Sequence, residues 1–135
     1  MYAGGASHPL RAPCLEILDL VATGRLDAVT SAEVVQEIFH RFARSPRAAE
    51  GAELAQATID LFSPVLPITH GIVARMPELA RRYPTHSARD LIHVATCLAH
   101  GIEAVVSPDT DFDRIREVRR IAPEDHAGLS SHVRR

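Results

Sequence analysis

Apolar residues recur at helical spacing through most of the chain, in stretches that are separated by glycine, proline and short polar segments. This periodicity predicts five helices, over residues 10–23, 30–42, 47–62, 69–82 and 87–100. Short apolar runs between the helices predict strands at residues 26–29, 64–68, 103–106 and 118–121, with one turn of helix at 111–115.

Local signals mark several of these ends. Thr30 and Glu33 have the spacing of a capping box at the start of the second helix, and Thr69 can cap the fourth. The prolines at both ends of the predicted strand 64–68 suit the edge of a sheet.

Strands that alternate with helices predict an α/β fold, a short and largely parallel sheet with helices on both faces. At 135 residues the chain is long enough for one domain with a sizeable core. We place the domain at residues 1–124 and expect residues 125–135 to form a loosely held tail. The opening segment Met1–Gly5 is too short and too rich in glycine to form the strand that usually begins such a sheet, so the first strand is expected to be absent.

Composition restricts the classes of function. The formal charge of −2 provides no global basic field of the kind that marks a tight duplex binder. Cys14 and Cys97 lie in helical patterns without metal-type spacing, which favours reduced thiols and a cytoplasmic protein. No apolar run approaches the roughly 20 residues that a membrane-spanning helix needs, so no contact with a membrane is expected.

The strongest candidate chemistry lies in the last third of the chain. Ser87-Ala-Arg-Asp90 opens a predicted helix, and strand 103–106 runs into Ser107-Pro-Asp109-Thr-Asp111-Phe-Asp113. A helix runs antiparallel to the strand that it precedes, so the start of this helix and the end of this strand are expected at one edge of the sheet. Carboxylates gathered there repel one another, and a divalent cation is a common remedy. The sequence therefore predicts a metal site.

Each of these acidic residues also has an ordinary structural interpretation. Ser87 and Asp90 have capping-box spacing, while Asp109 or Thr110 can cap the short helix. Cap and metal ligand are compatible roles for Asp90, because the helix dipole keeps a first-turn carboxylate ionised.

Four further residues are candidates with open alternatives. Glu37 lies on the border of the apolar face of its helix, where it can point inward or pair with Arg41. Arg89 can hold a phosphate or face solvent, and Ser107 can orient a carboxylate or simply end the strand. His93 follows Asp90 by three residues, but packing is the favoured role for this histidine. The sequence contains no GxSxG, Walker or GxGxxG motif, which leaves serine hydrolase, NTPase and dinucleotide chemistry without support.

Three segments together resemble the PIN-domain family, in particular VapC-type toxin ribonucleases. They are Thr30-Ser-Ala-Glu-Val-Val-Gln-Glu37-Ile, Ser87-Ala-Arg-Asp90-Leu-Ile-His-Val-Ala and Val106-Ser-Pro-Asp109-Thr-Asp111-Phe-Asp-Arg-Ile. The similarity spans essentially the whole chain. Members of the family open with a strand that ends in an aspartate, which would lie about five positions before Met1, so the resemblance implies either a start codon placed too late or a shortened protein.

The resemblance implies a PIN-like fold and metal-dependent hydrolysis of RNA phosphodiester bonds. It implies that Glu37, Asp90 and Asp109 are the catalytic acids and that these three, together with Asp111, hold Mg²⁺ or Mn²⁺. Ser107 would stand at the Ser/Thr position before the acidic loop, and Arg89 would contact a phosphate of the substrate. Single-stranded or looped RNA, a cognate antitoxin and a homodimeric state are the implied partners.

Two other functions compete with this hypothesis. The chain could be a catalytically impaired remnant that binds an antitoxin or another protein, an alternative that the missing aspartate favours. A phosphatase-like or response-regulator-like domain is disfavoured, because it needs a lysine and all fifteen basic residues are arginine.

Overall fold

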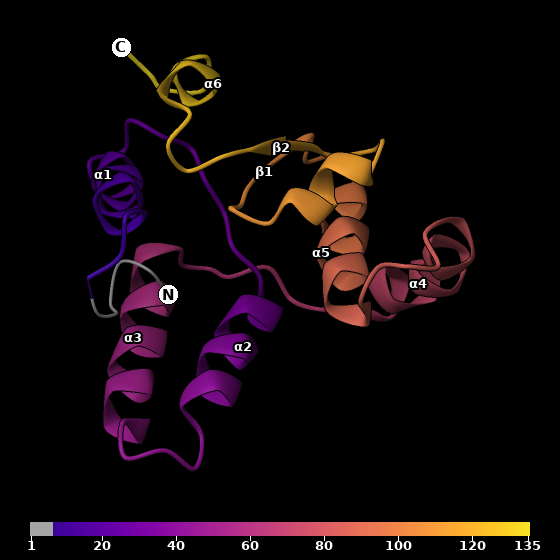
Figure 1. The fold of residues 1–135 in the computed structure, drawn as a ribbon, viewed down its shortest axis with the longest axis horizontal. Helices are drawn as coiled ribbons and strands as arrows, with labels where there is room; N and C mark the ends of the chain where they lie inside the picture. The colour runs from indigo at the N-terminus through magenta and orange to yellow at the C-terminus, as the bar shows by residue number, and fades with distance from the viewer. Residues whose placement is uncertain (1–6) are drawn as a thin grey trace. The chain divides into compact units, whose positions relative to one another are not determined.

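The computed structural model of the chain describes residues 7–135, so the opening segment Met1–Gly5 lies outside the described residues. The described residues form six α-helices, one 3₁₀ helix and a short parallel sheet, which confirms the α/β class (Figure 1). They fall into two compact units, one made of residues up to Leu66 together with Pro123–Arg135, and one made of Pro67–Ala122. The domain boundary expected at residue 124 stays a prediction.

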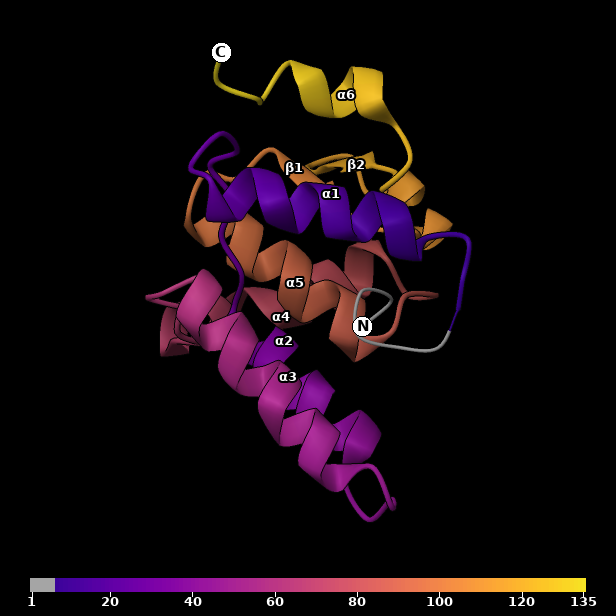
Figure 2. The ribbon, with the colours of Figure 1, turned by 90° about the vertical axis from the view of Figure 1, so that its left-hand side faces the viewer.

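The first unit is helical. It contains α1 (Arg11–Ala22), α2 (Ala32–Phe42), α3 (Ala48–Leu61) and α6 (His126–Ser130). Helices α2 and α3 lie side by side as a hairpin, which both ribbon views show (Figures 1 and 2). Gly51 of α3 lies directly against the side chain of Phe42, and Gly51 is buried in this close approach.

The two strands predicted in this unit are reduced to single bridges, so these predictions were wrong. Leu66 pairs with Ser31, and Pro64 and Pro67 near it lack the N–H groups that would help to extend this bridge into a ladder. In the predicted strand 26–29, Leu26 forms a bridge to Val133, while its N–H donates back to the carbonyl of Leu20 in α1.

The capping box predicted for α2 was also wrong. The cap residue is Ser31, and its side chain makes no capping hydrogen bond. Thr30 lies one residue before the cap and outside the helix. Its carbonyl accepts from the N–H of Leu66, and the N–H of Ala32 donates to the carbonyl of Leu66. Pairing with the chain around Leu66 therefore replaced the local cap.

The C-terminal residues contain regular structure. Helix α6 starts after Asp125, whose carboxylate accepts from the N–H of Gly128, and Leu129 is buried. The tail therefore contains a helix, and its loose attachment stays a prediction.

The second unit positions the acidic residues. It contains α4 (His70–Arg82), α5 (Ala88–Ala99), β1 (Ala104–Val106), the 3₁₀ helix η2 (Thr110–Arg114) and β2 (Arg119–Ile121). The sequence placed all five within a few residues. Thr69 caps α4 as predicted, accepting from the N–H of Ile72. Strands β1 and β2 are parallel, with Ala104 opposite Arg119 and Val106 opposite Ile121.

A compact apolar core joins these elements. It is built from buried residues of α4, α5, η2 and the segment that follows: Ile72, Leu79, Leu91, Val94, Ala95, Phe112, Ile115 and Val118. Helix α5 is followed by Gly101, whose φ of 64° lets the chain reverse into β1. The start of α5 and the end of β1 therefore face the same end of this unit.

Candidate metal centre

Asp90 is held at the start of α5. The hydroxyl oxygen of Ser87, the cap residue, accepts from the Asp90 N–H at 3.1 Å, as the predicted cap requires. The Asp90 side chain is half-buried in the first helical turn, where the positive end of the helix dipole favours a carboxylate. The local capping role and a position at the candidate site therefore coexist in one short segment.

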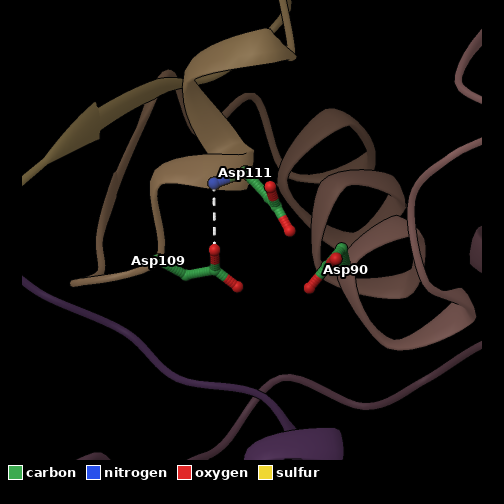
Figure 3. Close-up of side chains that lie close together, drawn as sticks. All are labelled: Asp90, Asp109 and Asp111. Carbon is green, nitrogen blue, oxygen red and sulfur yellow. Dashed lines mark hydrogen bonds between the residues drawn. The ribbon is translucent and has the colours of Figure 1, made fainter.

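Asp109 and Asp111 lie in the loop between β1 and β2, residues 108–118, here called the acidic loop. Hydrogen bonds between neighbouring residues hold both of them in place. The Ser107 hydroxyl accepts from the N–H of Asp109 at 3.1 Å. Asp109 in turn caps η2, because its Oδ1 accepts from the N–H of Asp111 at 2.9 Å (Figure 3). The prediction of Asp109 as a cap is confirmed, and Oδ2 of this carboxylate takes no part in the cap bond and can bind a second group.

The three carboxylates meet at one place. One oxygen each from Asp90, Asp109 and Asp111 lies within 4.8 Å of the others. Figure 3 shows these three side chains, from α5, from the loop before η2 and from η2, directed toward a common space. Asp109 and Asp111 are exposed. The sheet-edge argument from the sequence anticipated this convergence, although the two segments are about twenty residues apart.

Asp113, the third aspartate of the alternating run, is engaged elsewhere. Arg120 donates to both of its carboxylate oxygens, at 2.8 and 3.2 Å, and also donates to the Ser107 carbonyl at 2.9 Å. Hydrogen bonding from Arg120 holds the pKa of the Asp113 carboxyl below its ordinary value. Arg120 thus ties β2 to the acidic loop, a role that sequence reasoning missed.

A second arginine approaches the group itself. Nη2 of Arg114 lies 3.9 Å from Oδ1 of Asp111, and both side chains are more than half exposed. An ion pair of this length at the surface contributes little, because water and salt screen it. The negative charge of the group is therefore only weakly offset by this arginine.

The segment between α4 and α5 holds the acidic loop at two further points. Nε2 of His86 lies 3.0 Å from the carbonyl oxygen of Asp111. The Tyr83 hydroxyl donates to Glu117 at 2.6 Å and accepts from the Arg116 N–H at 3.2 Å. Glu117 also pairs with Arg82. Residues 83–86 fall between the predicted helices 69–82 and 87–100, and no sequence pattern indicated these contacts, because they depend on tertiary packing.

The other predicted site residues have the following positions. Glu37 lies half-buried in α2, in the first compact unit, so its part in the site stays a prediction. Arg89 is exposed in the first turn of α5, beside Asp90. His93 is half-buried one turn further along and is not part of the carboxylate group found among residues 7–135.

Comparisons with known proteins agree with the family resemblance of the sequence. A PIN-domain family model matches residues 1–118. A VapC ribonuclease of Mycobacterium bovis and ribonuclease VapC13 of Mycobacterium tuberculosis are each 36% identical over 122 residues, covering 90% of this chain and 93% of theirs. Ribonuclease VapC7 of Mycobacterium tuberculosis is 34% identical over 135 residues, covering 97% of this chain and 90% of its own. The search of solved structures returned no match.

Within residues 7–135, no helix combines the length and the apolar character that crossing a membrane requires.

Proposed function

Because the chain belongs to the PIN-domain family, we propose that it is a metal-dependent endoribonuclease and the toxin of a type II toxin–antitoxin pair. The observation that carries the proposal is the meeting of Asp90, Asp109 and Asp111, from two separate segments, within 4.8 Å. RNA is proposed as the substrate because the similar proteins are all named ribonucleases.

The three carboxylates fit a small divalent cation. Mg²⁺ binds oxygen ligands at about 2.1 Å in octahedral geometry, which spaces neighbouring ligands by roughly 3 Å and opposite ones by roughly 4 Å. Small side-chain rotations would bring carboxylate oxygens within 4.8 Å to those spacings. A donor set made only of carboxylate oxygens favours Mg²⁺ or Mn²⁺ over softer metals. Asp90, Asp109 and Asp111 would hold the ion, and Glu37 is proposed as a fourth acid.

The chain's own residues would prepare this site before any ion binds. Ser107 and Asp109 fix the backbone at the start of η2, and Ser87 fixes the first turn of α5, so the carboxylates need little reordering. A bound divalent ion lowers the pKa of its water and offsets charge that develops on the phosphate. With that chemistry, Glu37, Asp90 and Asp109 are the proposed catalytic acids, and no nucleophile from the protein is required.

The character of the substrate follows from exposure and charge. An exposed acidic site suits a flexible strand that metal ions bridge to the protein, which favours single-stranded or looped RNA over duplex. Arg89, which is exposed in the first turn of α5, is proposed to contact a phosphate beside the site, and Ser107 is proposed to support the substrate side of the acidic loop. A cognate antitoxin, a homodimeric state and a cytoplasmic location complete the proposal, and the similarity to VapC ribonucleases supports the antitoxin.

The test is cleavage of a mixed single-stranded RNA pool by the purified chain, with Mg²⁺ or with EDTA. We expect Mg²⁺-dependent cleavage that falls roughly 100-fold or more in Asp90→Asn and Asp109→Asn, since each removes a proposed metal ligand. Asn at position 109 can still cap η2 through its side-chain oxygen. Glu53→Gln removes an exposed carboxylate from α3 and is the matched control, for which no change is expected.

Cleavage that persists in EDTA or in both aspartate variants would contradict the proposal. A chain that binds Mn²⁺ at the three aspartates but leaves RNA intact would instead support the alternative, a catalytically impaired module that binds an antitoxin or another protein.

A further inference from the structure

Two side chains of the segment Tyr83–His86, here called the clasp, reach opposite ends of the acidic loop. His86 contacts the carbonyl of Asp111 near the start of η2. Tyr83 contacts the N–H of Arg116 and the carboxylate of Glu117 beyond its end. The two rings also touch edge to face, with centroids 5.5 Å apart. A single short segment therefore spans the loop that carries two of the three aspartates.

The clasp completes the hydrogen bonding of the Asp111 backbone. The N–H of Asp111 donates to Asp109, and its carbonyl accepts from His86. A carbonyl oxygen can only accept, so Nε2 of His86 carries the proton and donates. Nδ1 of His86 is buried without a hydrogen-bond partner among the described residues, and that isolation favours the same tautomer. With both polar groups of its backbone bound, the backbone of Asp111 is held in place, and the side chain starts from a fixed point.

The clasp also connects the two halves of the site. His86 immediately precedes Ser87, the residue that caps α5 and fixes the N–H of Asp90. The bond from His86 to Asp111 therefore joins the segment that carries Asp90 to the segment that carries Asp111. Tyr83 anchors the other end of the clasp, because its N–H donates to Leu79 in α4 and its side chain packs on the core.

Resting on the proposed metal-dependent function, we propose that His86 and Tyr83 are positioning residues that hold Asp111 and Asp109 opposite Asp90 before a metal ion binds. Exposed carboxylates close together repel one another, and η2 is a single short 3₁₀ segment with little stability of its own. Without the clasp, Phe112 and Ile115 would still hold the loop to the core, but the backbone around Asp111 would move more freely, and ion binding would have to restrict it. The metal would then bind more weakly, although the ligands themselves were intact.

The test measures Mn²⁺ affinity by the EPR signal of free Mn²⁺, and amide hydrogen exchange of the metal-free protein. In His86→Ala we expect Mn²⁺ binding weakened about fivefold, which corresponds to the loss of one hydrogen bond, and faster exchange of the Asp111 and Phe112 amides. His86→Gln should restore both toward wild type, because its side-chain N–H can still donate to the Asp111 carbonyl. His100→Ala, an exposed histidine after α5, is the matched control and should change neither.

Tyr83→Phe tests the other end of the clasp without removing the ring. It should speed exchange of the Arg116 amide, which loses its acceptor, and should weaken Mn²⁺ binding less than His86→Ala, since Asp111 keeps its own bond.

The outcomes separate the inference from the function on which it rests. Unchanged Mn²⁺ affinity and exchange in His86→Ala, or equal losses in the Ala and Gln variants, would overturn the positioning role. If the wild-type chain binds no Mn²⁺, or binds it equally well as Asp111→Asn, the proposed metal site fails instead. The exchange measurement still tests the clasp in that case, because it needs no metal.

Discussion

Individual polar side chains in this protein differ in whether they have a partner, and this difference sets their contribution to stability. Thr69 and Ser31 both stand at helix caps, yet only Thr69 accepts a backbone hydrogen bond. The Ser31 oxygen is buried and has no partner among the described residues. Sequence reasoning assigned a capping role to each start, because it sees the residue type and spacing but not the backbone pairing with Leu66 that replaced the cap of α2.

This contrast predicts opposite results for two similar substitutions. Thr69→Ala should lower the free energy of unfolding by about 1 kcal/mol, the usual cost of removing a helix cap. Ser31→Ala should be neutral or slightly stabilising, because the hydroxyl is buried without a bond that repays its desolvation. Urea denaturation of both variants measures the two changes. A loss in Ser31→Ala as large as that in Thr69→Ala would mean that the Ser31 hydroxyl has a partner in solution.

Glu117 shows how neighbours decide the ionisation of a single group. Burial acts to raise the pKa of this carboxyl, but hydrogen bonds from Tyr83, from a backbone N–H and from Arg82 together hold its pKa below the ordinary value. A lowered pKa in the folded state favours folding above the pKa of the unfolded chain, and this contribution is lost as the pH falls through the folded value. The clasp is therefore expected to loosen only in acid, well below neutral pH.

At the scale of elements, helices were predicted more accurately than strands. A helix of twelve or more residues repeats its apolar signal over several turns, and α3, α4 and α5 all lie within two residues of their predicted bounds. A strand depends on a partner elsewhere in the chain, which a local pattern does not contain. Two of the predicted strands, 103–106 and 118–121, pair with each other as β1 and β2. The other two, 26–29 and 64–68, pair only at single residues.

The same division holds for the candidate site. The convergence of Asp90 with Asp109 and Asp111 could be predicted, because it depends only on the directions of α5 and β1. The parts that hold the loop in place could not, since Arg120, Tyr83 and His86 reach it from other elements. Their contacts are set by tertiary packing, and their residue types are common on any surface.

The packing of α2 against α3 gives a prediction about a whole element. A Cβ atom at Gly51 would overlap the side chain of Phe42, whose ring also has the guanidinium carbon of Arg47 at 5.3 Å from its centre. Gly51→Ala should therefore destabilise the protein by about 1–3 kcal/mol through overpacking, although alanine is the better helix former by about 1 kcal/mol. Thermal unfolding followed by circular dichroism measures this loss.

The control for that experiment is Gly71→Ala in the first turn of α4. A Cβ there would meet only Thr69 Oγ1, at an ordinary contact distance of 3.8 Å. No loss of stability is expected, and a gain is the more natural result. Equal destabilisation by the two substitutions would show that α2 and α3 do not pack closely at Gly51.

For the molecule as a whole, the three aspartates are expected to make the free energy of unfolding depend on metal binding. Three carboxylates within 4.8 Å repel one another in the metal-free protein, and the exposed pair of Arg114 with Asp111 offsets this repulsion only weakly. Asp111→Asn removes one of these charges from an exposed position. It should raise the free energy of unfolding of the metal-free chain slightly, by less than about 1 kcal/mol, because water screens such pairs.

In the presence of metal, wild type should become more stable than Asp111→Asn. An ion that binds only the folded chain stabilises it by about 2.7 kcal/mol at a concentration one hundred times its dissociation constant. Wild type should therefore gain stability as Mn²⁺ is added and should lose that gain with EDTA, while Asp111→Asn should respond much less. Thermal unfolding across a Mn²⁺ titration measures both effects, with Glu53→Gln as an exposed-carboxylate control. A wild-type unfolding temperature that is independent of Mn²⁺, or one that rises equally in Asp111→Asn, would remove the three aspartates as the metal site, because binding and folding cannot be uncoupled when the ligands come from two separate segments.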